Sequence, residues 1–361
     1  MKSIPLSVAL TALLLTSSVH AQEAPAGDNP ENPQPSEKAV GDTAEAPTPV
    51  AEPEAEAAKS SVQRFGKKAL GTDVEILVYT ADASGAKSAA DAAFAEIERI
   101  DGLMSAWNAQ SEINRLNASA GGEPVAISAD TTLVLELAKR VSRRSQGAFA
   151  STWATLSGLW NFEIPEGQAP IVPDTGALEE RMKLVDDDKL VIGQGTAQLA
   201  QAGMAVGLGG ITKGHAVDRA LAVMVEKGFA DVLVFVGGDI ASTGRKGASP
   251  WVVGLQEPRS DGHFAVITLD DEAIATSGDY EAYFELDGKR YHHLLDPRTG
   301  YPAFGTRSVS VVAKDAASAD AYATAIFVLG PVEGLELAEK TEGLEAVIVD
   351  ADNQVTVSTG L

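Results

Sequence analysis

The last third of the chain contains short segments in which apolar and polar residues alternate, and this pattern constrains the fold more than any other. The segments are residues 251–256, 263–269, 283–286 and 289–295. Asp287-Gly288 separates the last two and is typical of a two-residue hairpin turn. Because strands joined by such short turns pair antiparallel, this part of the chain predicts a mainly antiparallel sheet.

The rest of the chain mixes helical and strand periodicity. Strands are predicted at 72–80, 231–236, 308–313, 345–349 and 355–357, with a hairpin of 189–192 and 198–206. Helices are predicted at 86–104, after a Ser128 cap, and at 215–226, 317–329 and 332–340. The expected class is α+β, with mixed or mainly antiparallel sheets flanked by helices in two closely fused subdomains.

The N-terminal region predicts export. Residues 1–21 combine Lys2, an apolar stretch and a small-residue exit at Ala21, the pattern of a secretory signal peptide. Residues 22–60 are rich in Ala, Pro and Glu and predict a disordered tether. We therefore expect a folded domain at 61–361 and a periplasmic location. The sequence contains no cysteine, so neither a disulfide nor a lipid-anchor cysteine is available and a hydrophobic core must supply the stability.

The formal charge of −23 restricts the partners. A field of that sign repels nucleic acid and anionic membrane surfaces, so we expect neither nucleic-acid binding nor membrane insertion after signal cleavage. It would also repel a polyphosphate substrate. Local cations or a bound metal would have to override the net charge.

A glycine-rich turn at 207–210 leads through two residues to Lys213 and a predicted helix. Glycines allow close backbone approach, a helix start presents free amides, and Lys213 adds a positive charge, so the segment suits an anion. The same composition also occurs in turns that bind nothing. Neither the Walker spacing nor a GxGxxG unit is present, which argues against ordinary kinases and dehydrogenases.

Two further patterns offer oxygen and imidazole groups. Asp320 and Thr324 lie four residues apart on a predicted helix, and such hard oxygen ligands suit Mg²⁺. The spacing equally fits a solvent-exposed Asp320 and a Thr324 bonded back to its helix. His292 and His293 alternate faces of a strand, so only one can enter a site. Either a catalytic base or a hydrogen-bonded structural histidine is compatible with this position.

Several motifs occur together in a fixed order. They are residues 70–72, 103–107, 111–117, 159–162, 209–215, 236–240, 275–280, 291–300 and 320–330. In this order they resemble the FAD:protein FMN transferase family, the ApbE proteins, over most of 69–330. The resemblance implies Mg²⁺-dependent transfer of FMN from FAD to a Thr or Ser hydroxyl of an exported or membrane flavoprotein, with release of AMP.

The resemblance also implies roles for individual residues. Metal ligation is expected from Asp320, Thr324 and the Gly210 carbonyl, and His293 matches the candidate base. The expected FAD contacts are Leu70, Trp107, Ala148, Phe149, Ala150, Gly207, Lys213 and Leu295.

Two positions depart from the family pattern. Ala150 and Gly207 stand where the family usually has aspartates that can accept hydrogen bonds from the adenosine end of FAD. Two alternative functions therefore remain open. One is an FAD pyrophosphatase that yields FMN and AMP, and the other is a non-catalytic flavin-binding accessory protein.

Overall fold

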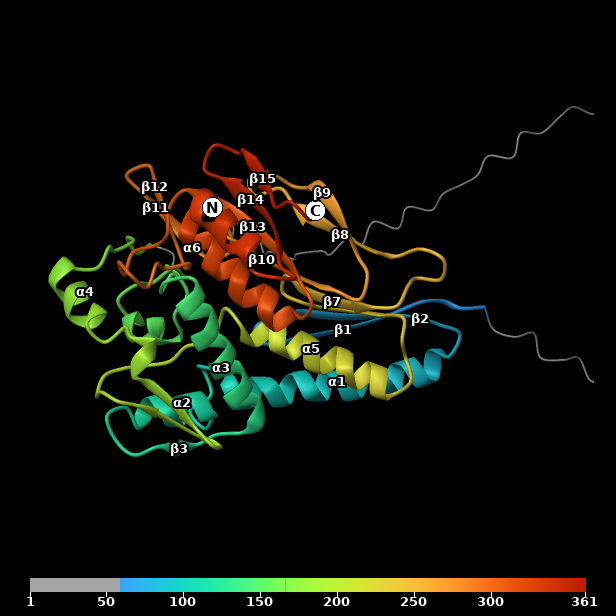
Figure 1. Cartoon of the computed structure of the whole chain (residues 1–361), viewed down its shortest axis with the longest axis horizontal. Coiled ribbons are helices and arrows are strands. Elements are labelled where there is room, and N and C mark those ends of the chain that lie inside the picture. Colours follow the sequence, from blue (N-terminus) through green and yellow to red (C-terminus); the bar gives the residue numbers. More distant parts are fainter. Residues whose placement is uncertain (1–58, 166) are drawn as a thin grey trace, which may run out of the picture.

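An eight-stranded sheet forms the centre of the computed structural model, which describes residues 59–165 and 167–361 (Figure 1). The strand order is β1-β2-β6-β7-β10-β13-β14-β15, and every neighbouring pair is antiparallel. The strands are β1 Ser61–Ala69, β2 Thr72–Thr80, β6 Val232–Val236, β7 Asp239–Thr243, β10 Ala273–Gly278, β13 Thr306–Ala313, β14 Glu345–Asp350 and β15 Val355–Val357. The expected signal peptide and all but the last two residues of the expected tether lie outside the described residues.

Three smaller sheets and the helices surround the central sheet. The small strands are β3 Val125–Ala126, β4 Leu190–Gly193 and β5 Thr196–Leu199 in one sheet, β8 Trp251–Gln256 and β9 His263–Leu269 in a second, and β11 Tyr283–Leu286 and β12 Lys289–His292 in a third. The α-helices are α1 Ala83–Met104, α2 Glu112–Ala118, α3 Ala129–Arg144, α4 Thr175–Met182, α5 Thr212–Glu226 and α6 Ala316–Lys340. Two 3₁₀ helices are η1 Ser151–Leu156 and η2 Asp187–Lys189.

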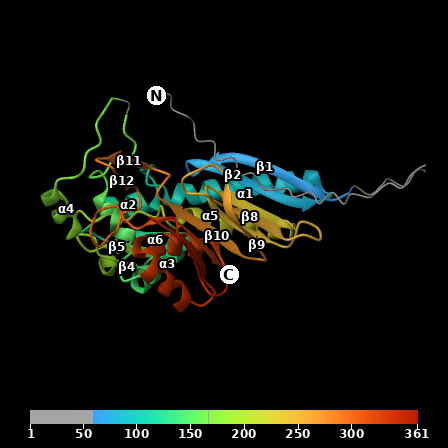
Figure 2. The ribbon, with the colours of Figure 1, turned by 90° about the horizontal axis from the view of Figure 1, so that it is seen from above.

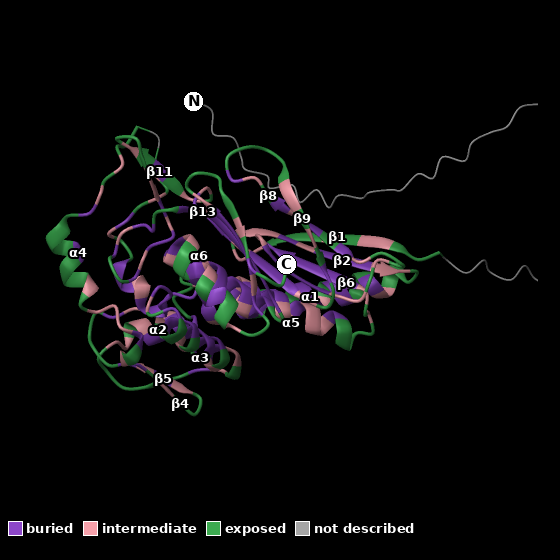
Figure 3. Cartoon of the chain, turned by 45° about the horizontal axis from the view of Figure 1, so that its top comes forward, coloured by how far each residue is buried: buried purple, intermediate pink, exposed green. Residues whose placement is uncertain are grey.

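The inner strands of the central sheet are buried on both faces because apolar residues occupy both sides of them. Along β2, Ile76 and Val78 face the core shared with α1, α5 and α6, whereas Leu77 faces the opposite core beneath the β8–β9 hairpin. This follows from the two-residue period of a strand. Figures 2 and 3 show the layers and the buried residues between them; α4 and the β11–β12 hairpin form one end of the molecule.

Helix α6 runs through the core and bends in its second half. It is long and apolar enough to cross a membrane by composition, but most of it is buried inside the protein. Gly330 has φ 81°, and Pro331 follows it. These two residues break the helical geometry, so α6 consists of two helical segments that meet at a kink, in agreement with the two helices predicted at 317–329 and 332–340.

The first turns of α5 and α6 cross at very close range. A Cβ on Gly214 would overlap the Ala316 carbonyl oxygen, so only glycine fits there. The Asp218 carboxylate accepts hydrogen bonds from the Ala316 and Ala317 amides at 2.7 and 2.9 Å, and thereby caps α6 from α5. Burial raises the pKa of Asp218 to about 7, although the two amides favour its ionised form.

The predicted class is confirmed, whereas some boundaries were wrong. The predicted strand 198–206 ends at Leu199, and 289–295 ends at His292. Helix α5 begins at Thr212 rather than at 215, so Lys213 lies in its first turn. Strands β1, β7 and β10 and helices α2 and α4 were not predicted.

We expect Gly214→Ala to lower the free energy of unfolding by roughly 2 kcal/mol, because the methyl group must push α5 and α6 apart. Gly102 in α1 is the matched control, since a Cβ there meets nothing within 4 Å. Gly102→Ala should raise the free energy of unfolding by about 0.5–1 kcal/mol through helix propensity. Urea unfolding followed by circular dichroism measures both. Equal stabilities of the two variants would contradict the crossing.

Candidate active site

Four elements meet at one end of the central sheet. The first turn of α5 carries Lys213, α6 carries Asp320 and Thr324, the β6–β7 turn leads to Asp239, and β10 ends near Ser277. Two contacts place the end of α1 and the β1–β2 turn at the same end of the central sheet. The Thr212 hydroxyl lies 3.8 Å from the sulfur of Met104, the last residue of α1, and Gly237 lies against Thr72 at the start of β2.

Lys213 lies between two buried carboxylates. Its Nζ is 3.1 Å from Asp239 Oδ2 and 3.4 Å from each oxygen of Asp320. Asp320 Oδ2 also accepts the Gly214 amide at 3.2 Å. Burial opposes the charge of Lys213, but the two carboxylates outweigh it and raise the pKa above its ordinary value. The ammonium is therefore charged at neutral pH. The Lys213 side chain keeps 28% of its exposure, so a ligand can reach it.

Oxygen groups gather beside this ion cluster. The Ser277 hydroxyl lies 3.3 Å from the Thr324 hydroxyl. A Cβ on Gly210 would stand 2.9 Å from Thr324 Oγ1 and 3.4 Å from Phe149 Cε2. Glycine at this position therefore lets the turn backbone approach the Thr324 hydroxyl. Asp320 is 4% exposed, which excludes the alternative of a solvated carboxylate.

The two histidines have different surroundings. His292 ends β12, and its Nε2 lies 2.7 Å from the Ala303 carbonyl, so it is a structural residue. His293 follows the strand, and its amide donates to the Ala282 carbonyl. Burial, followed by the neighbouring His292, lowers the pKa of His293 to about 4, and Lys213 contributes in the same direction. Its imidazole is thus neutral at pH 7, and its Nδ1 is buried and has no hydrogen-bond partner among the described residues.

The expected FAD-contact residues are spread around this cluster. Phe149 lies near Gly210, because a Cβ on Gly210 would stand 3.4 Å from its ring, and Leu295 packs in the aromatic-rich core formed with Leu156 and Trp160. Leu70 has φ 51° in the β1–β2 turn, and Trp107 is 97% exposed beyond the end of α1. Neither Leu70 nor Trp107 has a hydrogen bond or aromatic contact to the Lys213 cluster among the described residues. Their predicted roles stay predictions.

The two departures from the family pattern have local explanations. A Cβ on Gly207 would lie 2.9 Å from Ala154 Cβ and 3.1 Å from Trp153 Cζ2, while the Trp153 indole donates to the Gly207 carbonyl at 3.1 Å. An aspartate at 207 would require Trp153 to move. After Ala150, the amides of residues 151 and 152 donate to the Asp187 carboxylate, both at 2.9 Å. Asp187 therefore holds the start of η1.

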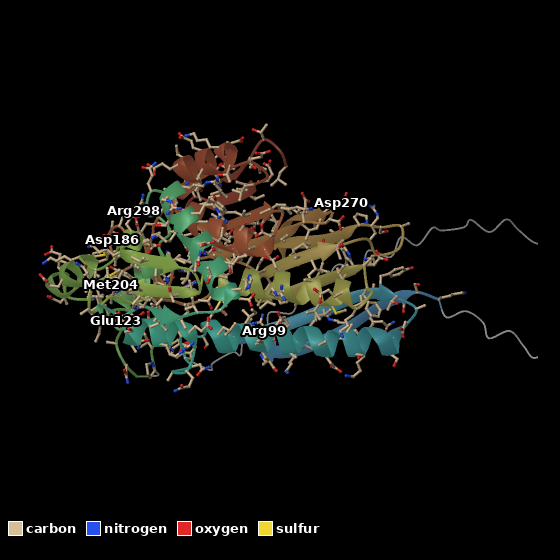
Figure 4. All side chains as sticks on the ribbon, turned by 60° about the horizontal axis from the view of Figure 1, so that its bottom comes forward. Arg99, Glu123, Asp186, Met204, Asp270 and Arg298 are labelled. Atoms are coloured by element: carbon tan, nitrogen blue, oxygen red, sulfur yellow. The ribbon has the colours of Figure 1, made fainter. Side chains whose placement is uncertain are left out.

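A cavity of about 460 Å³ opens beside Ala150, next to the Asp296-Pro297-Arg298 turn. Arg298 and Asp186, which line it, lie on the same side of the molecule (Figure 4). The lining does not include Lys213, Asp320 or Thr324, so this cavity and the ion cluster are separate features.

Sequence reasoning missed several residues of the site. Asp239 lies in the recognised Gly-Gly-Asp motif, but no role was predicted for it. Ser277 lies in the motif at 275–280, and its approach to Thr324 depends on a 47-residue separation that no local pattern reveals. His215, part of the glycine-turn motif, bonds Asp130 at 2.9 Å and ties α5 to α3 instead of entering the site.

Comparison with known proteins identifies the family. The sequence matches the ApbE family over residues 70–348. The chain belongs to the ApbE family. An FAD:protein FMN transferase of Treponema pallidum is 33% identical over 81% of this chain and 85% of its own length. One from Vibrio cholerae is 33% identical over 71% of this chain and 78% of its own length.

Solved ApbE structures have the same fold. The ApbE protein of Thermotoga maritima superimposes with a TM-score of 0.76 at 32% identity, covering 83% of this chain and 98% of its own. The flavinyl transferase ApbE of Pseudomonas stutzeri gives a TM-score of 0.75 at 28% identity, covering 84% and 97%. The predicted α+β ApbE-like class is thereby confirmed.

We expect the His293 imidazole of the ligand-free protein to titrate with a pKa of about 4, because burial disfavours its charged form. Side-chain nitrogen NMR between pH 3.5 and 8 measures this directly. The His293→Ala variant identifies the resonance. A His293 signal that titrates near the ordinary value of about 6.5 would contradict the described environment.

Proposed function

We propose that this protein is an exported, periplasmic transferase that uses Mg²⁺ to move FMN from FAD to a Thr or Ser hydroxyl of a partner flavoprotein, releasing AMP. The observation that carries the proposal is the cluster of Lys213, Asp320, Thr324 and Gly210 in a chain of the ApbE family. The cluster combines a charged ammonium with oxygen donors, which is what a metal-bound diphosphate requires.

The residues fit Mg²⁺ by the chemistry of their donors. Asp320 offers a carboxylate, Thr324 a hydroxyl and Gly210 a carbonyl, and the absence of a side chain at Gly210 leaves the approach to Thr324 free. Among residues 59–165 and 167–361, no three His, Asp or Glu side chains group as a metal site, so the neutral oxygens are needed. Such a mixed oxygen set with one carboxylate is usual for Mg²⁺ on phosphates. When bound, the ion would neutralise diphosphate charge.

The residues of this chain then have defined tasks in the transfer. The acceptor oxygen forms a bond to the FMN phosphorus, the bond from that phosphorus to the bridging oxygen breaks, and AMP leaves. Neutral His293 accepts the hydroxyl proton at an imidazole nitrogen. Lys213 holds the diphosphate and offsets its charge, which aligns the phosphorus with the acceptor. The local cations thus offset the repulsion expected from the net charge of −23.

Transfer can be tested with purified mature protein, FAD, Mg²⁺ and an exported flavoprotein domain that carries the acceptor hydroxyl. We expect the acceptor to become fluorescent and heavier by one FMN less water, with one AMP released per transfer. His293→Ala should keep FAD bound but slow transfer by about 10²- to 10⁴-fold, the usual contribution of a general base. Asp320→Asn should abolish metal-dependent turnover but have a smaller effect on FAD binding. Fluorescence, mass spectrometry and nucleotide analysis give the readouts.

The alternatives give different products under the same conditions. A pyrophosphatase would produce FMN and AMP without any acceptor, and an accessory protein would bind FAD without cleaving it. An unmodified acceptor, alongside an established transferase that modifies it, would refute the proposal.

The metal set can be tested without flavin. Gly210→Ala places a methyl group against the Thr324 hydroxyl, so we expect Mn²⁺ affinity to fall by about tenfold or more, as for other perturbed ligand positions. Gly209→Ala is the control, because a Cβ there meets nothing within 4 Å. Electron paramagnetic resonance measures free Mn²⁺, and thermal unfolding checks the fold. Equal affinities of the two variants would exclude Gly210 from the metal site.

A further inference from the structure

The β6–β7 turn delivers Asp239 to the helix side of the sheet. Gly237 and Gly238 have φ values of 51° and 99°, which allow a two-residue turn that pairs Val236 with Asp239. Ile240 next in the strand faces the opposite core, and Ala241 returns to the core of α5 and α6. Asp239 lies two residues before Ala241, so both side chains are on the same face of the strand. The Asp239 carboxylate therefore points toward α5 and α6.

Asp239 is a buried carboxylate whose cationic neighbour among the described residues is Lys213; burial, followed by the nearby Asp320, raises the pKa of Asp239 well above its ordinary value, and Lys213 opposes this shift. Asp239 is 1% exposed, and its Oδ2 has no hydrogen bond among the described residues. That oxygen is 3.1 Å from Lys213 Nζ, closer than either Asp320 oxygen at 3.4 Å. A buried ion pair adds little net stability, because desolvation of both charges offsets their attraction. The pair of Asp239 and Lys213 is therefore better explained by function than by stability.

The reason lies in competition for Asp320. The Lys213 ammonium and a divalent cation would both bind the Asp320 oxygens. If Asp320 were the only carboxylate beside Lys213, the ammonium would pair with it and block metal binding. A second carboxylate gives the ammonium another partner at almost the same place. When both carboxylates are ionised, the cluster has a net charge of −1, and a divalent ion would change it to +1, which suits a diphosphate.

We propose that Asp239 is a positioning residue that retains Lys213 beside the diphosphate while it leaves the Asp320 oxygens available to the divalent cation. This inference rests on the proposed function of the same site. Asp239 acts through Lys213 and is neither a metal ligand nor a base. Its effect on metal binding therefore depends on the lysine.

A double-mutant cycle tests this dependence with Mn²⁺ alone, in the absence of FAD and acceptor. The variants are Asp239→Asn, Lys213→Met and the double variant. With Lys213 present, Asp239→Asn should weaken Mn²⁺ binding by about tenfold, because the ammonium turns to Asp320. In the Lys213→Met background, the same change should cost less than about threefold. Electron paramagnetic resonance of free Mn²⁺ gives the affinities.

Two controls complete the experiment. Asp270→Asn removes the same charge from an exposed side chain on the turn after β9, and should leave Mn²⁺ affinity unchanged. Thermal unfolding checks each fold, and Asp239→Ser replaces Asp239→Asn if the asparagine variant does not fold. An equal cost of Asp239→Asn in both backgrounds overturns the inference but leaves the transferase proposal standing. Failure of the wild-type protein to bind Mn²⁺ overturns the inference together with the metal dependence proposed above.

Discussion

The close crossing of α5 and α6 is the contact on which the site depends. Gly214 allows the two backbones to touch, and Asp218 fixes the crossing by capping α6 from α5. Lys213 precedes Gly214, and Asp320 lies one turn into α6, so the crossing itself places an ammonium against a carboxylate. The packing interaction and the chemistry are thus determined by adjacent residues. A change that separates the helices separates the charges as well.

The central sheet adds two polar side chains to the groups that α5 and α6 carry. The Gly-Gly turn before Asp239 adds a second carboxylate from below the helices, and β10 brings Ser277 to Thr324. Asp239 and Asp320 therefore both lie beside the Lys213 ammonium, and Ser277 lies beside the Thr324 hydroxyl. Because the chain carries a charge of −23, an anionic ligand requires local positive charge, which Lys213 and a bound divalent ion would supply. Burial strengthens these local interactions relative to the distant surface charges.

Local patterns predicted the elements, whereas tertiary contacts determined the site. Strands β8 and β9 have the predicted bounds, because an uninterrupted alternation is read directly from the sequence. Strand β10 was missed because Ala-Thr-Ser-Gly has little strand propensity and is buried between β7 and β13. The motifs identified Lys213 and Asp320, but their contact spans 107 residues. Only the family resemblance connected them in advance, and it gave no role to Asp239.

Ala150 and Gly207, where the family resemblance predicts aspartates, both lie beside residues that make local contacts. At 207 the Trp153 indole occupies the space that a side chain would need, and after Ala150 the Asp187 carboxylate binds the free amides. These contacts make the region around Ala150 and Gly207 a packed unit. Gly207 belongs to the same glycine turn as the proposed metal ligand Gly210, whereas Trp153 and Asp187 lie outside α5, α6 and that turn. On the proposed function, we therefore expect changes at Ala150 and Gly207 to alter contacts with the adenosine end of FAD rather than the residues assigned to the transfer.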